Sequence, residues 1–211
     1  MDRTFWLARW QENKIGFHEG QPNSYLVANA DWLAPCRRIL VPLCGKTEDL
    51  AYLAGQGHDV VGIELVEDAV KQFFAEHGTT PTVEPAGDDL MIYRAGAITV
   101  FAGDIFGVTE THVGPIDGIF DRAALVALPP DMRRRYVAHL SVLAPAARRE
   151  LLLTVEYPAG ASEGPPFCID ETEVRASFPS ATIHVVGFAP APQGRLDGKM
   201  LERCYTLEWP A

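Results

Sequence analysis

The sequence predicts an α/β fold: a mostly parallel, doubly wound sheet of seven strands with helices on both faces and a C-terminal antiparallel hairpin. Three observations predict it. Seven short apolar runs have the length of strands, helical patterns separate the early runs, and only the Pro- and Gly-rich stretch Pro190–Gly198 separates the last two. Since that stretch is too short for a crossover helix, the final two strands should pair antiparallel at one edge of the sheet.

The predicted strands share an apolar run that is bounded by turn residues. They are Arg38–Val41, Asp59–Ile63, Ile98–Phe101, Gly118–Phe120, Leu151–Val155, Ile183–Phe188 and Leu201–Leu207. The chain shows no internal repeat, low-complexity tract or linker. We therefore expect one domain over residues 1–211, in which residues 1–35 form a helical N-terminal segment.

Two helices are predicted from residues that recur at helical spacing. The helix after Glu64 should end at Gly78, and its apolar face consists of Val66, Ala69, Val70, Phe73 and Phe74. A later helix should begin after Pro129-Pro130-Asp131, and its face consists of Met132, Tyr136, Leu140 and Leu143.

Composition and charge exclude several classes of function. The 211 residues are 47% hydrophobic and 22% charged, with a net charge of −10, which argues against a surface that tracks nucleic-acid phosphates. No apolar stretch approaches the roughly 20 residues of a membrane span, and residues 1–30 lack the core of a signal peptide. We expect a cytoplasmic protein that binds small molecules. The cysteines Cys36, Cys44, Cys168 and Cys204 should be free thiols, and no spacing indicates a metal site.

The stretch Ile39–Glu64 has the layout of a nucleotide-binding strand-turn-helix-strand unit. Gly45 lies in the turn, where it would let a ligand approach the backbone, and a helix should open at Thr47. Glu64 ends the second apolar run, roughly 20 residues beyond Leu43, where a carboxylate can accept hydrogen bonds from both ribose hydroxyls.

This unit lacks the features that bind a diphosphate. Of the three spaced glycines of a dinucleotide site only Gly45 is present, and Glu48 and Asp49 would repel a diphosphate at the start of the helix. S-adenosylmethionine, a nucleoside with a cationic sulfonium and an amino-acid tail, therefore suits the unit better than NAD or ATP.

Three of the four tryptophans lie ahead of the first predicted strand. Trp6 and Trp10 share one face if the segment is helical. The helix could simply dock on the core, or, with the turn Ile15-Gly16-Phe17, it could act as a lid that closes over an apolar, partly cationic ligand and excludes water.

Several ordered segments of the chain resemble the thiopurine S-methyltransferase family. They are Phe5-Trp6-Leu7-Ala8-Arg9-Trp10, Asn13-Lys14-Ile15-Gly16-Phe17-His18, Val41-Pro42-Leu43-Cys44-Gly45-Lys46, Gly62-Ile63-Glu64, Phe120-Asp121-Arg122-Ala123-Ala124-Leu125 and Gly164-Pro165-Pro166-Phe167. The resemblance implies the Rossmann-like sheet of the class I methyltransferases and favours the lid. It also implies a cytoplasmic S-adenosylmethionine-dependent enzyme that methylates the sulfur of thiopurines and similar aromatic thiols, and in the family also selenium and tellurium compounds.

The resemblance further implies a set of site residues. The cofactor site corresponds to Trp6, Trp10, Phe17, Leu43, Gly45, Glu64, Asp104, Ile105 and Arg122. Phe17 and Arg122 would also contact the acceptor. Arg122 would hold the donor's carboxylate or steer an anionic acceptor, although it could instead form a structural ion pair with its neighbour Asp121. The family's vertebrate members have a second arginine near the acceptor, for which Arg195 is the only nearby candidate in this sequence.

We assign no catalytic residue, because methyl transfer from a sulfonium to a thiolate destroys charge and an apolar, water-poor site favours it without a nucleophilic side chain. His18 follows Phe17, but a lone histidine on a loop is more often no base. Two alternatives stay open. The chain could methylate another small nucleophile, such as an aliphatic thiol, a halide or an amine, or it could bind S-adenosylmethionine without catalysis.

Overall fold

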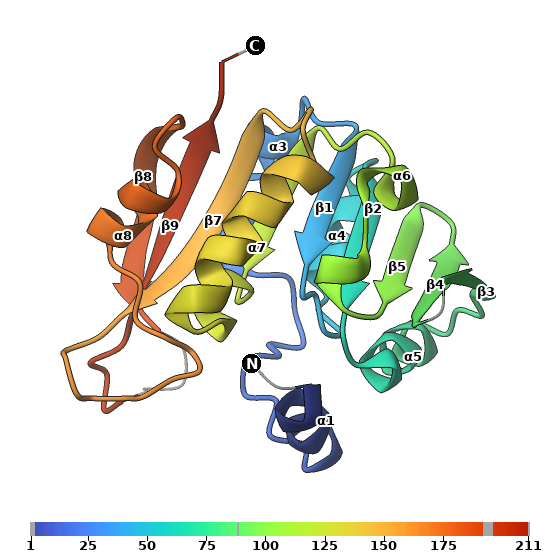
Figure 1. Cartoon of the computed structure of the whole chain (residues 1–211), viewed down its shortest axis with the longest axis horizontal. Helices are drawn as coiled ribbons and strands as arrows, with labels where there is room; N and C mark the ends of the chain where they lie inside the picture. The colour runs from blue at the N-terminus through green and yellow to red at the C-terminus, as the bar shows by residue number, and fades with distance from the viewer. Residues whose placement is uncertain (1–2, 88, 192–195, 211) are drawn as a thin grey trace.

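The computed structural model describes residues 3–87, 89–191 and 196–210. Within them one sheet runs in the order β3-β4-β5-β2-β1-β6-β7-β9-β8 (Figure 1). The strands are β1 (Arg38–Pro42), β2 (Asp59–Glu64), β3 (Thr82–Gly87), β4 (Leu90–Ala95), β5 (Ile98–Ala102), β6 (Gly118–Arg122), β7 (Arg149–Glu156), β8 (Thr182–Pro190) and β9 (Leu201–Glu208).

Helices precede β1 and join most of the strands that follow it. They are α1 (Arg3–Gln11), α2 (Ser24–Ala28), α3 (Ala30–Leu33), α4 (Asp49–Gly55), α5 (Glu67–Glu76), α6 (Glu110–Val113), α7 (Pro130–Leu143) and α8 (Glu171–Ser177), with 3-10 turns η1 (Ile105–Gly107) and η2 (Leu125–Ala127). In Figure 1, α7 covers the front of the sheet, and α3 and α4 lie behind it. None of the helices in the described ranges is both long and apolar enough to cross a membrane.

The centre of the sheet is parallel, as predicted. β1 pairs with β2 and β6, β2 pairs with β5, and β6 pairs with β7, all in parallel. The last two strands form the predicted antiparallel pair, and β9 lies between β7 and β8. Because the chain leaves β1 toward β2 and later returns to its other side at β6, the sheet has a topological switch point at β1, where open α/β sheets bind ligands.

The predicted number of seven strands is wrong, because β3 and β4 add an antiparallel pair beyond β5 within the described residues. β3 reads Thr-Val-Glu-Pro-Ala-Gly and is exposed along most of its length, so it shows no apolar run. A proline is tolerated there because β3 is an edge strand whose outer N–H groups need no partner.

Both predicted helices are present and bury most of their predicted faces, although Met132 is only half-buried and α7 begins at Pro130 rather than after Asp131. On α5, Ala69, Val70, Phe73 and Phe74 are buried, and on α7, Tyr136, Leu140 and Leu143 are buried. The helix expected to open at Thr47 begins instead at Asp49, because the Thr47 hydroxyl donates to the Asp49 carboxylate at 2.7 Å and occupies the turn ahead of the helix.

Candidate functional site

A cavity of about 630 Å³ opens at the carboxyl ends of the parallel strands. Eight of the nine residues predicted for the cofactor site line it, all except Gly45. From the N-terminal segment these are Trp6, Trp10 and Phe17; from the ends of β1, β2 and β6 they are Leu43, Glu64 and Arg122; and from the loop after β5 they are Asp104 and Ile105. The fold therefore brings together residues that are spread over more than half of the chain.

Glu64 is fixed at the end of β2 by two backbone amides. Its Oε2 accepts a hydrogen bond from the N–H of Gly45 at 2.7 Å, and its Oε1 accepts one from the N–H of Val66 at 2.7 Å. Burial of the carboxyl group raises its pKa from 4.5 to about 7, and the two amides act against that rise. Each oxygen keeps a further lone pair, so the carboxylate can also accept hydrogen bonds from a ligand.

Gly45 lies under the Trp10 ring and outside the lining of the cavity. Its φ is +56°, and a Cβ at this position would lie 3.1 Å from the Trp10 ring, so an indole rather than a ligand makes the close approach to its backbone. Gly45 is absent from the lining of the cavity. It contributes indirectly, because it supports Trp10 and donates its N–H to Glu64.

The N-terminal segment places an aromatic cluster at the cavity. Phe17 packs edge-on against Trp6 and Trp10, with ring centroids 6.0 and 5.8 Å apart. Trp10 is buried, and the cluster rests on Val66 and Ala69 near the start of α5. In Figure 1, α1 lies beyond the carboxyl end of β1, apart from the helices that cover the sheet. This position is the one that a lid requires.

Two residues that line the cavity have left-handed backbones although neither is glycine. Leu43 follows β1 with φ +49°, and Ala123 follows β6 with φ +62°. Such conformations cost of order 1–3 kcal/mol and cluster at binding sites and active sites. Both lie at the topological switch point.

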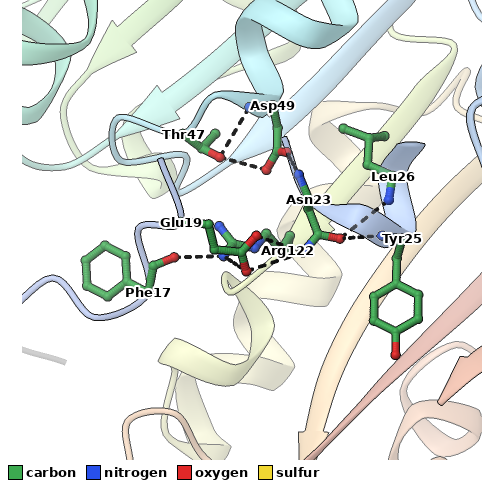
Figure 2. Close-up of polar contacts among 8 residues, drawn as sticks. All are labelled: Phe17, Glu19, Asn23, Tyr25, Leu26, Thr47, Asp49 and Arg122. Carbon is green, nitrogen blue, oxygen red and sulfur yellow. Dashed lines mark hydrogen bonds and ion pairs between the residues drawn. The ribbon is translucent and has the colours of Figure 1, made fainter. Parts of the chain in front are cut away.

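Arg122 does not pair with Asp121. Asp121 is fully buried and accepts hydrogen bonds from the hydroxyl of Tyr136 at 2.6 Å and the N–H of Leu125 at 3.2 Å. Arg122 instead reaches the N-terminal segment, where its Nη2 donates to the carbonyl of Phe17 at 2.7 Å and to Oε1 of Glu19 at 2.6 Å (Figure 2).

Glu19 also lines the cavity, and sequence reasoning missed it. Local sequence gives no signal for it, because its ion pair with Arg122 joins residues 103 positions apart. The pair forms only when the N-terminal segment folds back over the end of β6.

The loop after β5 is held by its own cap and by α7. Asp104 is exposed and its Oδ1 accepts a hydrogen bond from the N–H of Phe106 at 3.0 Å, which starts η1. Ile105 is buried, and its carbonyl lies 2.9 Å from Nε2 of His139. Asp104 thus presents a carboxylate at the cavity wall and Ile105 an apolar surface.

Much of the remaining lining is apolar and includes Val126, Leu128, Met132, Pro165, Pro166 and Met200, and Thr154 and Glu202 add polar groups to it. Among the described lining residues there is no histidine, lysine or cysteine. His18 is outside the lining, and burial lowers its pKa. All four cysteines are free thiols, and the described part of the chain contains no cluster that could hold a metal ion. Arg195 lies outside the described residues.

Comparison with known proteins places this site in context. A family model described as thiopurine S-methyltransferase matches residues 1–188. The thiopurine S-methyltransferase of Pseudomonas paraeruginosa is 47% identical over 180 residues, which cover 84% of this chain and 82% of the relative. A thiopurine S-methyltransferase of Pseudomonas putida is 41% identical over an alignment that covers 98% of this chain and 99% of the relative.

Solved structures share the fold at low sequence identity. The 1,6-didemethyltoxoflavin-N1-methyltransferase of Burkholderia thailandensis, solved with S-adenosylhomocysteine, has a TM-score of 0.64 at 17% identity and covers 99% of this chain and 87% of its own. The magnesium protoporphyrin IX methyltransferase of Synechocystis, also with S-adenosylhomocysteine, has a TM-score of 0.64 at 15% identity and covers 99% of this chain and 100% of its own.

Proposed function

Because the chain belongs to the thiopurine S-methyltransferase family and uses S-adenosylmethionine as methyl donor, we propose that it methylates the sulfur of small aromatic thiols, thiopurines among them. Selenium and tellurium compounds are a further class of acceptor within this proposal. The observation that carries it is the lining of the cavity, which is mainly apolar beyond the residues predicted for the donor and supplies no histidine, lysine or cysteine from the described residues.

In this proposal the donor occupies the end of the cavity formed by β1, β2 and the loop after β5. Glu64 accepts hydrogen bonds from the ribose hydroxyls, and Leu43 and Ile105 enclose the adenine, with Asp104 beside it. Trp6, Trp10 and Phe17 cover the sulfonium and keep water from it. Arg122 lies between the donor and the acceptor.

The chemistry requires alignment more than it requires a reactive side chain. The acceptor sulfur attacks the methyl carbon in line with the donor sulfur, so that a carbon–sulfur bond forms while the donor's methyl–sulfonium bond breaks and its electron pair stays on the donor sulfur. A thiolate and a sulfonium become two neutral sulfides. An apolar, water-poor site favours this loss of charge relative to solvated reactants.

A panel of acceptors at one fixed pH tests the proposal. With S-adenosylmethionine present, aromatic thiols that are ionised near neutral pH should be methylated faster than aliphatic thiols, alcohols or amines, because the described lining residues supply no histidine, lysine or cysteine as a base. Mass spectrometry of the product should place the new methyl group on sulfur. Faster methylation of an alcohol, an amine or a halide would overturn the proposal. A strong fall of transfer in Glu64→Ala at subsaturating S-adenosylmethionine would show that the measured activity comes from this site.

A further inference from the structure

Glu19 and Arg122 form an ion pair at the wall of the cavity. Nη2 of Arg122 lies 2.6 Å from Oε1 of Glu19, and their side chains are only 12% and 17% exposed. Both residues line the cavity. The same Nη2 also donates to the carbonyl of Phe17, so one nitrogen of the guanidinium is committed to the N-terminal segment.

Glu19 is held in turn by a chain of hydrogen bonds that leads to the start of α4 (Figure 2). Nδ2 of Asn23 lies 3.3 and 3.4 Å from the two carboxylate oxygens of Glu19. The N–H of Asn23 donates to Oδ1 of Asp49 at 2.7 Å, and Asn23 and Asp49 are 2% and 1% exposed. Since Asn23, the N-cap residue of α2, and Asp49, the first residue of α4, are both buried, Glu19 meets Arg122 from a rigid support.

The charge of Arg122 matters for the reaction because charge disappears along it. A cation beside the acceptor favours a bound thiolate, but it favours the thiolate more than the transition state, in which part of the negative charge has already been lost. A full positive charge would therefore tighten binding and slow the chemical step. A carboxylate on the same guanidinium weakens that effect while the guanidinium keeps its orientation.

We propose that Glu19 is a positioning residue for methyl transfer, which orients Arg122 and offsets its charge so that an anionic acceptor is steered without being held too strongly. This inference rests on the proposed function, because it requires an acceptor that reacts as an anion. The alternative is that the pair only fastens the N-terminal segment to the end of β6.

Other ionisable groups surround the pair. Asp49 faces it from α4, and burial raises the pKa of its carboxyl group. His18 precedes Glu19, and burial together with Lys46 lowers its pKa. Cys44 lies near Arg122 in the turn after β1, and burial keeps its pKa well above the usual range. Glu202 lines the same cavity from β9. A pH profile must therefore be compared between variants that leave all four in place.

The experiment compares Glu19→Gln with Glu12→Gln. Glu12 lies in the same N-terminal segment, its side chain is 55% exposed, and it pairs with Lys14, so the control makes the same charge change away from the cavity. For each purified variant, kcat and KM for an aromatic thiol are measured across pH at saturating S-adenosylmethionine. Circular dichroism checks folding, and calorimetry gives the affinity for S-adenosylhomocysteine.

In Glu19→Gln the unbalanced Arg122 should stabilise the bound thiolate. The acid limb of the kcat profile should then move to lower pH by roughly one unit, as a nearby opposite charge does to a pKa. On the plateau, kcat should fall about three- to tenfold while KM for the thiol stays level or falls, because the ground state is stabilised more than the transition state. Glu19→Asp should restore part of the plateau, and Glu12→Gln should match the wild type.

Two results would overturn the inference, and they differ from each other. Suppose that the wild type methylates thiols and that Glu19→Gln loses cofactor affinity or activity with no shift of the acid limb. The ion pair then only holds the N-terminal segment to the end of β6, and the proposed function stands. If the wild type methylates no thiol but another class of acceptor, the proposed function fails and the role of Glu19 fails with it.

Discussion

The indole of Trp10 lies on the bare Cα of Gly45, where a Cβ would stand 3.1 Å from Cζ2 of the ring. The N–H of the same glycine donates a hydrogen bond to the carboxylate of Glu64. One backbone position thus touches both the aromatic cover of the cavity and the carboxylate proposed for the ribose. A side chain here should disturb both contacts.

Gly45→Ala should weaken binding of S-adenosylhomocysteine, because the methyl group displaces Trp10 and the strained turn loosens its hold on Glu64. The left-handed backbone alone should cost roughly 1–2 kcal/mol of unfolding free energy. Gly78→Ala is the matched control, since Gly78 has a φ of +62° and its Cβ would meet nothing within 4 Å. Thermal melts should show similar losses for both variants, and calorimetry should show weaker binding for Gly45→Ala alone. Equal affinities in the two variants would contradict the role given to this contact.

Glu64 should make cofactor binding depend on pH. Its pKa in the folded chain is about 7, so the ligand-free carboxyl group is partly protonated near neutral pH, and ribose hydroxyls bind its ionised form. Affinity for S-adenosylhomocysteine should therefore fall between pH 8 and pH 6. Glu64→Gln should weaken binding at pH 8 by roughly 1.5–3 kcal/mol, the range for a hydrogen bond to a charged group, and should flatten the pH dependence. Calorimetry at several pH values measures both effects.

The same carboxyl group affects the stability of the ligand-free protein. Because its folded pKa, about 7, is above the ordinary 4.5, its contribution to stability is fully present below pH 4.5 and is lost as the pH rises through 7. Asp121 and Glu150 are buried acids with raised pKa values as well, so the test is the difference between the wild type and Glu64→Gln. A difference in unfolding free energy that does not change with pH would show that Glu64 is ionised throughout.

Local sequence could identify the site residues that lie within one short segment, the strand-turn-helix-strand unit Ile39–Glu64. Leu43 follows β1 and Glu64 is the last residue of β2, and the spacing of the unit predicts that both reach the same edge of the sheet. Gly45 was identified as a special backbone position, but the sequence does not say whether a ligand or a side chain approaches it. Glu19 could not be found, because its ion pair with Arg122 forms only when the N-terminal segment folds back over the end of β6. β3 escaped prediction because an exposed edge strand needs no apolar pattern.

Deletion of residues 1–17 should leave a folded sheet that has lost most methyl transfer. The removed residues include Trp6, Trp10 and Phe17, so the cavity would be open to water, whereas both large clusters of buried apolar residues lie beyond residue 17. Circular dichroism and single-turnover rates measure fold and transfer separately. In the full chain, S-adenosylhomocysteine should slow protease cleavage before residue 18. If the truncated protein unfolds, α1 is part of the core and the lid interpretation is wrong.

Ala123→Gly should leave stability unchanged or raise it slightly. Glycine relieves roughly 1–2 kcal/mol of left-handed backbone strain in the folded state at φ +62°. It also raises the conformational entropy of the unfolded chain, which lowers the free energy of unfolding by roughly 0.5–1 kcal/mol. Ala124→Gly is the comparison, because Ala124 is buried at φ −82° and ψ −59° and gains no relief from glycine. Denaturant titrations should therefore give a lower free energy of unfolding for Ala124→Gly than for Ala123→Gly. Equal losses in the two variants would mean that the turn carrying Arg122 is not strained.

Arg122 should be required as a cation with a planar fork. Arg122→Lys keeps the charge but cannot present the same geometry to Phe17, Glu19 and a ligand, so it should retain partial activity. Arg122→Glu should lose more than about 100-fold in kcat/KM, since it removes a charged hydrogen bond and repels both an anionic acceptor and Glu19.

The double variant Glu19→Arg, Arg122→Glu separates the structural role of Arg122 from its role in the reaction. It restores an ion pair and should therefore recover thermal stability without recovering activity. A rise mainly in the apparent KM for S-adenosylmethionine in Arg122→Lys would assign the residue to the donor's carboxylate, and a loss mainly against anionic acceptors would assign it to the acceptor. Recovery of activity in the exchanged variant would leave Arg122 with a purely structural role.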